Sequence, residues 1–208
     1  PAKRTQTKMK LYFSPASPYV RKVRAVAIEC GLIDRVELVP TDVYASGNNY
    51  EKVNPVHRVP ALQLDDGMSL FDSPVICEYL DSLHQGHKLF PPVGKARWQA
   101  LRLQAMGDGI LDAAVPRRQE SLRPEAQQSA ARIATYQKMM RQTLDALEAE
   151  ADQLSGATIG TLAVACALGY LDFRFAADEW RKGRPKLAAW YESFAKRPSL
   201  AQTVPPPA

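Results

Sequence analysis

The chain has 208 residues, of which 46% are hydrophobic and 24% are charged. These are ordinary values for a globular protein with one large domain or two small ones, so disorder is not expected outside the ends. The net charge is +5, but the 27 Lys and Arg residues are spread along the chain. Such scatter argues against nucleic-acid binding, and a mild positive excess suits a small acidic ligand equally well.

The cysteine pattern indicates a protein without disulfide bonds. Cys30, Cys77 and Cys166 lie far apart in the sequence and form no CxxC pair. An odd number of cysteines without metal-like spacing argues against both a disulfide framework and a zinc site, and we interpret all three as buried apolar thiols. The expected location is therefore the reducing cytoplasm.

Neither a metal site nor a membrane segment is expected. His84 and His87 flank Gly86 in the expected linker, with no carboxylate or cysteine at ligand spacing. His57 is expected near a ligand-binding edge instead. The strongest apolar run, residues 162–171, is about half of the ~20 residues that a bilayer crossing requires. Residues 1–8 are polar and are given no structural role.

The first part of the chain alternates between strand and helix patterns. The Asp65-Asp66-Gly67 sequence between two short β-prone runs is a strong hairpin signal. The expected elements are strands at 10–13, 36–39, 61–64 and 68–71, with helices over 20–28 and 75–83. The order βαβ, loop, ββα predicts a mixed four-stranded sheet with a parallel pair and an antiparallel hairpin.

The rest of the chain is predicted to be all-helical. The sequence changes at residues 86–95 to Gly, His and Pro, which is typical of a linker between a first domain at 9–85 and a second at 96–208. The helix that starts after Thr158 is apolar almost all round, so we expect the other helices to pack on it. Helices are expected at about 96–122, 125–154, 158–175 and, as a last pair, 185–202.

Three turns of the first domain carry candidate chemistry. Ser17 followed by Pro18 is typical of a helix N-cap, which places a hydroxyl and unpaired amides at the positive end of a helix dipole. Val59 precedes Pro60 at the start of a strand, and this peptide bond is a candidate for the cis form, with the Val59 backbone free to pair with an extended peptide. Phe71-Asp72-Ser73-Pro74 repeats the cap-plus-proline pattern, so Ser73 offers a hydroxyl and amides to a carboxylate.

Each of these three signals also has an ordinary structural interpretation, as a helix cap or an edge proline. Their order along the chain is more informative: a cap after the first strand, a proline before the third and a cap after the fourth. In one mixed sheet these turns are expected to meet at the same edge. Together they would provide a thiol site, a strand-like backbone and a carboxylate site, which a small acidic tripeptide with a thiol would satisfy.

With these motifs the chain resembles the cytosolic glutathione S-transferase superfamily, and more closely its serine-type bacterial members with a tau-like or zeta-like active-site motif. The resemblance extends over nearly the whole chain. In the second half it rests on residues 109–114, 167–174 and 185–199, the last with Trp190 and an Arg197-Pro198-Ser199 ending. It implies a thioredoxin-like N-terminal domain that binds glutathione and an all-helical C-terminal domain.

The resemblance also implies roles for individual residues. Ser17 would be the catalytic hydroxyl that holds the glutathione sulfur as a thiolate, with Ser14 as the rival. Val59 would pair with the cysteinyl backbone, Arg58 with the glycyl carboxylate, and Asp72 and Ser73 with the γ-glutamyl end. Because serine rather than cysteine precedes Pro18, reductase activity through a mixed disulfide is not expected.

The remaining expectations concern the second substrate and the assembly. A small apolar electrophile would lie between Tyr19 and the helix around Met106 and Ile110, and the protein would be a homodimer active in detoxification. The alternatives are a glutathione-binding protein without transferase activity and a glutathione-dependent cis-trans isomerase.

The central helix departs from the pattern of the family that the chain resembles. Thr161 stands in place of the Asp that completes a capping box in many relatives, so we expect a weakened cap at Thr158.

Overall fold

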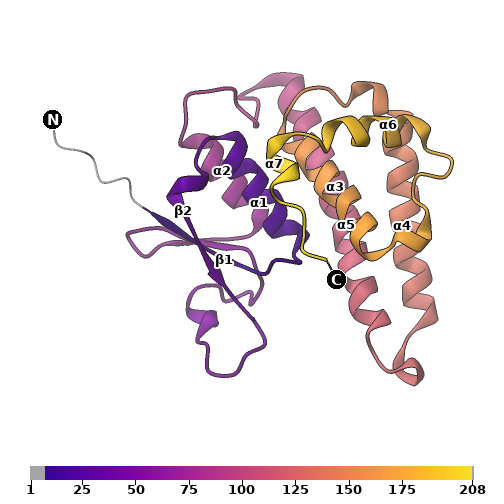
Figure 1. Ribbon diagram of the computed structural model, residues 1–208, viewed down its shortest axis with the longest axis horizontal. Coiled ribbons are helices and arrows are strands. Elements are labelled where there is room, and N and C mark those ends of the chain that lie inside the picture. Colours follow the sequence, from indigo (N-terminus) through magenta and orange to yellow (C-terminus); the bar gives the residue numbers. More distant parts are fainter. Residues whose placement is uncertain (1–7, 208) are drawn as a thin grey trace. The chain divides into compact units, whose positions relative to one another are not determined.

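The computed structural model describes residues 8–207, so most of the N-terminal extension, residues 1–7, lies outside the described residues. The chain divides into two compact units. Of the described residues, the first unit consists of residues 8–89 together with Gln202–Pro207, and the second is Phe90–Ala201 (Figure 1). The division at Leu89 falls inside the segment that the sequence predicts to be a linker.

The first unit contains the predicted mixed four-stranded sheet. Its strand order is β2-β1-β3-β4, with β1 parallel to β2 and antiparallel to β3, and β3 antiparallel to β4. This arrangement confirms the expected thioredoxin-like topology. The strands are β1 (Met9–Phe13), β2 (Val36–Pro40), β3 (Ala61–Gln63) and β4 (Ser69–Leu70), and the helices are α1 (Pro18–Glu29) and α2 (Ser73–Ser82).

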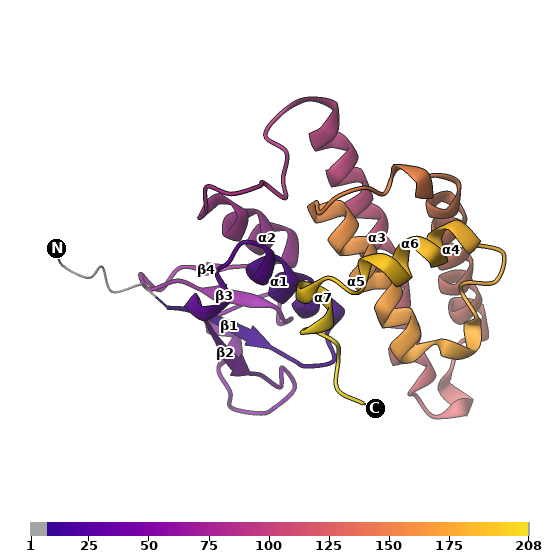
Figure 2. The ribbon, with the colours of Figure 1, turned by 45° about the horizontal axis from the view of Figure 1, so that its top comes forward.

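The central strand shows why this sheet forms. In β1, Met9 and Leu11 are buried while Lys10 between them is exposed, which is the alternation of a strand with one covered face. Helices α1 and α2 contact each other and lie side by side along the sheet (Figure 2). Strands β3 and β4 are shorter than predicted, since Leu64 and Met68 belong to the turn and Phe71 lies beyond the end of β4. In the turn the Leu64 N–H donates to the Met68 carbonyl at 2.8 Å, and the Met68 N–H donates to the Asp66 carboxylate at 2.9 Å.

The second unit is all-helical, as predicted. Its long helices are α3 (Gly94–Ser121), α4 (Ala130–Ala149) and α5 (Ile159–Arg174), followed by α6 (Pro185–Phe194) and α7 (Pro198–Ala201). Helix α4 starts five positions later than the predicted residue 125, because Ser129 is its N-cap and accepts a hydrogen bond from the Arg132 N–H at 3.3 Å. The residues before it form a short 3₁₀ segment, Glu125–Gln127.

Helix α5 is the centre of the second unit, as its apolar sequence predicts. Every residue from Ile159 to Leu171 is buried. Two glycines let α3 approach it closely: a Cβ on Gly107 would lie 2.6 Å from the Ala163 backbone, and a Cβ on Gly160 would lie 2.5 Å from the Ala100 carbonyl oxygen. Within residues 8–207, none of the helices has the length and hydropathy needed to cross a bilayer.

The predicted weakness of the α5 cap was wrong. The Thr161 N–H donates to the Thr158 hydroxyl oxygen at 3.2 Å, and the Thr158 N–H donates to the Thr161 hydroxyl oxygen at 2.9 Å. Both bonds of a capping box are therefore made, because a threonine at this position can return the bond that Asp or Glu usually supplies.

Candidate functional site

The register of the sheet brings the three predicted turns of the first unit to one edge. Tyr12, near the end of β1, pairs with Ala61 at the start of β3. Leu62 pairs with Leu70 in the next hairpin, so the chain leaves β4 beside the point where it enters β3. The turn after β1, the proline before β3 and the turn after β4 consequently lie together.

Ser17 is the N-cap of α1, as predicted. Its hydroxyl oxygen accepts a hydrogen bond from the Val20 N–H at 3.3 Å, while its own N–H donates to the Ser14 carbonyl at 3.1 Å. The hydroxyl oxygen therefore serves as an acceptor, and its hydrogen can be donated to a ligand. Both serines are half-buried, and Ser17 stands at the positive end of the helix dipole, where an anion is favoured.

The second turn contains Val59, whose bond to Pro60 is predicted to be cis. The Val59–Pro60 peptide bond is cis. Among residues 8–207, no hydrogen-bond partner is found for the N–H or the carbonyl of Val59. The neighbouring Arg58 side chain is exposed, and Val59 itself is half-buried. A strand-like segment could use both backbone groups of Val59.

The third turn differs in detail from the prediction. Helix α2 begins at Ser73, and its N-cap is Asp72, whose side chain makes no capping hydrogen bond. In α1 the proline directly follows the N-cap residue, whereas in α2 one residue stands between them. That residue is Ser73, which is therefore the first helical residue. Ser73 is buried and Asp72 is exposed, and the Phe71–Asp72 peptide bond is also cis.

Two buried residues hold the segment that precedes Val59 in the sequence, and no sequence motif pointed to either of them. The Tyr50 hydroxyl donates to the Arg58 carbonyl oxygen at 2.8 Å, and the Asn54 side-chain amide donates to the same oxygen at 2.7 Å. Tyr50 is 3% exposed and Asn54 is 2% exposed. Burial raises the pKa of Tyr50 to about 12, so the phenol stays protonated and remains a donor. The Asn54-Pro55 pair is visible in the sequence, but its link to Arg58 is not.

The predicted electrophile residues are divided between the two units. Tyr19 belongs to the first unit, and Met106 and Ile110 belong to α3 in the second. Tyr19 and Met106 are half-buried, whereas Ile110 is fully buried. Their grouping into one pocket remains a proposal.

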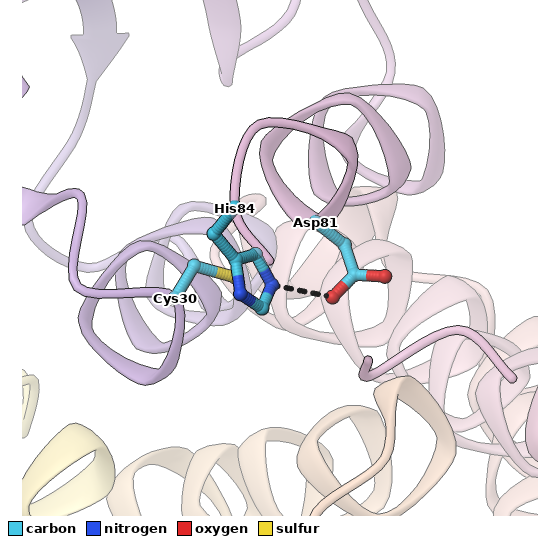
Figure 3. Close-up of side chains that lie close together, drawn as sticks. All are labelled: Cys30, Asp81 and His84. Atoms are coloured by element: carbon cyan, nitrogen blue, oxygen red, sulfur yellow. Dashed lines mark hydrogen bonds and ion pairs between the residues drawn. The ribbon is translucent and has the colours of Figure 1, made fainter. Parts of the chain in front are cut away.

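A second polar cluster lies at the ends of α1 and α2. A carboxylate oxygen of Asp81, a ring nitrogen of His84 and the Cys30 sulfur lie within 4.8 Å of one another (Figure 3). The expectation that His84 has no carboxylate or cysteine at ligand spacing was therefore wrong. Asp81 stands three residues before His84, and the packing of α1 on α2 brings in Cys30, which is distant in sequence.

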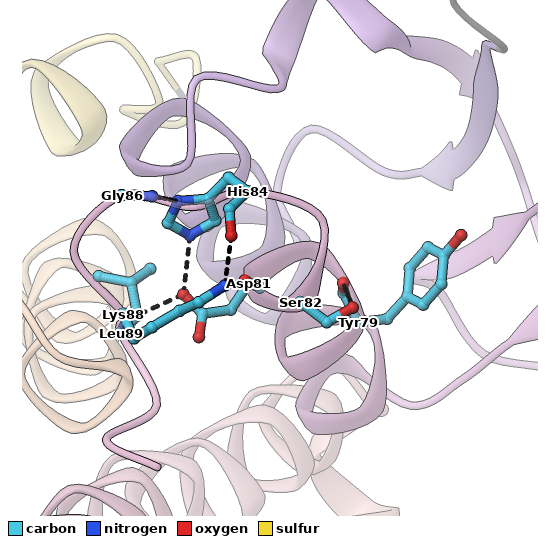
Figure 4. A network of polar contacts seen from close by, with 7 residues as sticks. All are labelled: Tyr79, Asp81, Ser82, His84, Gly86, Lys88 and Leu89. Atoms are coloured by element: carbon cyan, nitrogen blue, oxygen red, sulfur yellow. Dashed lines mark hydrogen bonds and ion pairs between the residues drawn. The ribbon is translucent and has the colours of Figure 1, made fainter.

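The hydrogen bonds of this cluster are those of a helix end. The Asp81 carboxylate accepts from the Leu89 N–H at 2.8 Å and lies 3.0 Å from His84 Nε2, while the Gly86 N–H donates to His84 Nδ1 at 3.1 Å. The Lys88 ammonium donates to the carbonyls of Asp81 and His84, both at 2.5 Å (Figure 4). Both ring nitrogens of His84 thus have partners, and a cation already occupies the negative end of the α2 dipole. The arrangement ties the segment that follows α2 back onto that helix.

Comparison with known proteins shows the family to which this fold belongs. Residues 11–88 match the family model of the glutathione S-transferase N-terminal domain, and residues 127–193 match that of the C-terminal domain. The chain belongs to the glutathione S-transferase family.

Individual relatives cover nearly the full length of the chain. The uncharacterized GST-like protein YibF of Escherichia coli K12 is 33% identical over 96% of this chain and 100% of its own. A crystal structure of a glutathione transferase family member from Pseudomonas fluorescens Pf-5 with bound glutathione has a TM-score of 0.92 and 43% identity, covering 96% of this chain and all of that one. A glutathione S-transferase from Methylobacillus flagellatus KT with glutathione bound gives a TM-score of 0.90 at 34% identity, with the same coverage.

Proposed function

We propose that this protein is a serine-type glutathione transferase, which binds glutathione along the edge formed by the three turns and uses it against a small apolar electrophile. The observation that carries this proposal is the sheet register, which puts a helix-capping hydroxyl, an unpaired backbone and a helix N-terminus side by side. Two structural relatives are described with glutathione bound. This supports the same ligand here.

In the proposed complex the three parts of glutathione have separate partners. The N–H and carbonyl of Val59 pair with the cysteinyl backbone, and Arg58 attracts the glycyl carboxylate. Ser73 and the first amides of α2 receive the γ-glutamyl carboxylate, while Asp72 accepts from the γ-glutamyl ammonium group. The thiol then faces Ser17.

Ser17 would supply the main chemical contribution. Its hydroxyl oxygen accepts from the Val20 N–H, so its hydrogen can be donated to the sulfur and stabilise the thiolate. A free thiol with a pKa of about 8.5 is mostly protonated at neutral pH, and a depression of one unit requires about 1.4 kcal/mol. The thiolate would then attack a bound electrophile held near it, for which Tyr19, Met106 and Ile110 remain the proposed contacts.

The experiment is a calorimetric titration with glutathione, together with thiolate absorbance of the complex as a function of pH. The wild type is expected to bind and to show a thiolate whose apparent pKa lies below that of free glutathione. Ser17→Ala should raise that pKa by about one unit. Ser14→Ala is the matched control and should leave it unchanged.

The outcomes separate the proposed roles. An effect confined to Ser14→Ala would move the catalytic hydroxyl to Ser14. Binding without a depressed thiol pKa would indicate a glutathione-binding protein without transferase activity. The absence of binding would contradict the proposal altogether. Turnover of a maleyl-type diketo acid, without conjugate formation, would identify a cis-trans isomerase.

A further inference from the structure

The carbonyl group just before the proposed ligand-pairing residue is held from inside the protein. Both the Tyr50 hydroxyl and the Asn54 amide donate to the Arg58 carbonyl oxygen, and both donors are more than nine-tenths buried. A carbonyl oxygen has two lone pairs, so these two donors satisfy it completely. The Arg58 carbonyl therefore points to the buried pair.

The loop that leads to Arg58 is held by the same asparagine. The Asn54 side-chain oxygen accepts from the Val56 N–H at 2.9 Å, and its main-chain carbonyl accepts from the His57 N–H at 2.9 Å. His57 has a φ of 60°, in the left-handed region, and its ring lies 2.5 Å from the Val43 carbonyl oxygen. The direction of the chain is thus fixed before it reaches Arg58.

The planarity of the next peptide bond transmits this direction to Val59. The Arg58–Val59 bond is trans, so its C=O and N–H point in opposite directions within one plane. Because the carbonyl of Arg58 is turned toward Tyr50 and Asn54, the N–H of Val59 must be turned away from them. That N–H has no partner among the described residues.

We propose that Tyr50 and Asn54 are positioning residues for glutathione binding. By donating hydrogen bonds to the Arg58 carbonyl from the protein interior, they orient the Val59 N–H toward the cysteinyl carbonyl of the ligand. This inference rests on the proposed function. Neither residue touches the ligand in this arrangement. Their contribution is to remove the rotational freedom of one peptide plane before the ligand arrives, which lowers the cost of ordering the site on binding.

The test compares Tyr50→Phe with the wild type and with Tyr44→Phe, a control in which the ring is 83% exposed. Tyr50→Phe removes one donor but keeps the aromatic ring, which lies 5.7 Å from the Tyr12 ring and 6.0 Å from the His57 ring. We expect the dissociation constant for glutathione to rise about fivefold, because the peptide plane must then be ordered when the ligand binds. The Val59 amide, which has no partner in the ligand-free protein, should gain protection from hydrogen exchange when glutathione binds, and this gain should be smaller in Tyr50→Phe. The thiol pKa of bound glutathione should stay unchanged, because Ser17 is untouched.

Asn54→Ala, which removes the second donor, should weaken binding further in the same way. Unchanged affinity and exchange in Tyr50→Phe would overturn the positioning role and leave the proposed function intact. A general loss of exchange protection across the first unit, with a shifted thiol pKa, would also overturn it, because it would indicate a purely structural role. If the wild type itself does not bind glutathione, the proposed function fails, and this inference fails with it.

Discussion

Tyr12 and Ala61 are directly paired across β1 and β3, although about 50 positions of sequence separate them. This pairing puts the Ser14–Ser17 turn, which follows β1, next to the Val59–Pro60 bond, which precedes β3. The Tyr12 hydroxyl also donates to the Gln63 side-chain oxygen at 3.2 Å. One pair of strands therefore decides which backbone faces the proposed catalytic hydroxyl.

The environment of Cys30 predicts a thiol that reacts slowly with disulfide reagents. Burial, with a smaller effect from the Asp81 charge, raises the pKa of Cys30 to about 12, and Cys77 and Cys166 are fully buried. With a disulfide colour reagent at pH 8, we expect no rapidly reacting thiol in the native protein and three after unfolding in denaturant. A fast thiol that disappears in Cys30→Ser would contradict this expectation.

The same shift predicts a loss of stability in alkaline solution. Above the ordinary thiol pKa of about 8.5, the unfolded chain releases the Cys30 proton, whereas the folded chain retains it up to about pH 12. The folded state thus binds more protons over this interval, so the free energy of unfolding should fall as pH rises through it. Cys30→Ala should show a shallower fall in urea titrations at about pH 8.5 to 10.5, within the range set by these two pKa values.

Removal of the Asp81 carboxylate should destabilise the first unit. Asp81→Ala leaves the buried Leu89 N–H without its acceptor and His84 without its carboxylate partner. We expect a loss of about 2–3 kcal/mol in the free energy of unfolding, measured by urea denaturation. The control is Asp145→Ala, because Asp145 is 66% exposed and its ion pair with Arg184 should be worth about 1 kcal/mol or less. Equal losses in the two variants would argue against a structural role for the buried cluster.

The close approach of α3 and α5 makes a strong prediction for Gly107. In Gly107→Ala the new methyl group would lie 2.6 Å from the Ala163 carbonyl carbon and 2.7 Å from the Val164 nitrogen. These are backbone atoms, so the helices must separate, and we expect a loss of about 1–3 kcal/mol.

Gly109 provides the matched control for this substitution in the same helix. No neighbouring group lies within 4 Å of the position that a methyl group would take there, so Gly109→Ala should stabilise the protein by about 0.5–1 kcal/mol through helix propensity. Urea denaturation of both variants is the measurement. A similar sign for the two changes would contradict the packing argument.

The threonine capping box is expected to contribute to stability despite its unusual composition. Thr161→Val keeps the shape of the side chain but removes the oxygen that accepts from the Thr158 N–H. We expect a loss of about 1 kcal/mol by thermal or urea unfolding. Thr135→Val, at an exposed position of α4, should change stability by less than about 0.5 kcal/mol. A neutral Thr161→Val would show that the reciprocal bond adds nothing.

Local sequence signals predicted the elements well where the chemistry is local. Ser17-Pro18 fixes the start of α1 because the cap and the proline act within one helical turn. The same logic failed by one residue at Ser73, because Asp72 is the N-cap of α2. The start of α4 lies five residues beyond its predicted position, because Ser129 is its N-cap. Boundaries are decided by which of several possible caps the surrounding structure can satisfy.

The sequence by itself determined the family, the order of strands and helices, and the three turns with candidate chemistry, because caps, prolines and hydrophobic periodicity act over a few residues. Only the tertiary structure decided which distant groups meet: Cys30 with Asp81 and His84, and Tyr50 and Asn54 with the Arg58 carbonyl. These contacts depend on how α1 packs on α2 and on how a loop folds back over itself. Such packing follows from the burial of whole faces, and no short stretch of sequence encodes it.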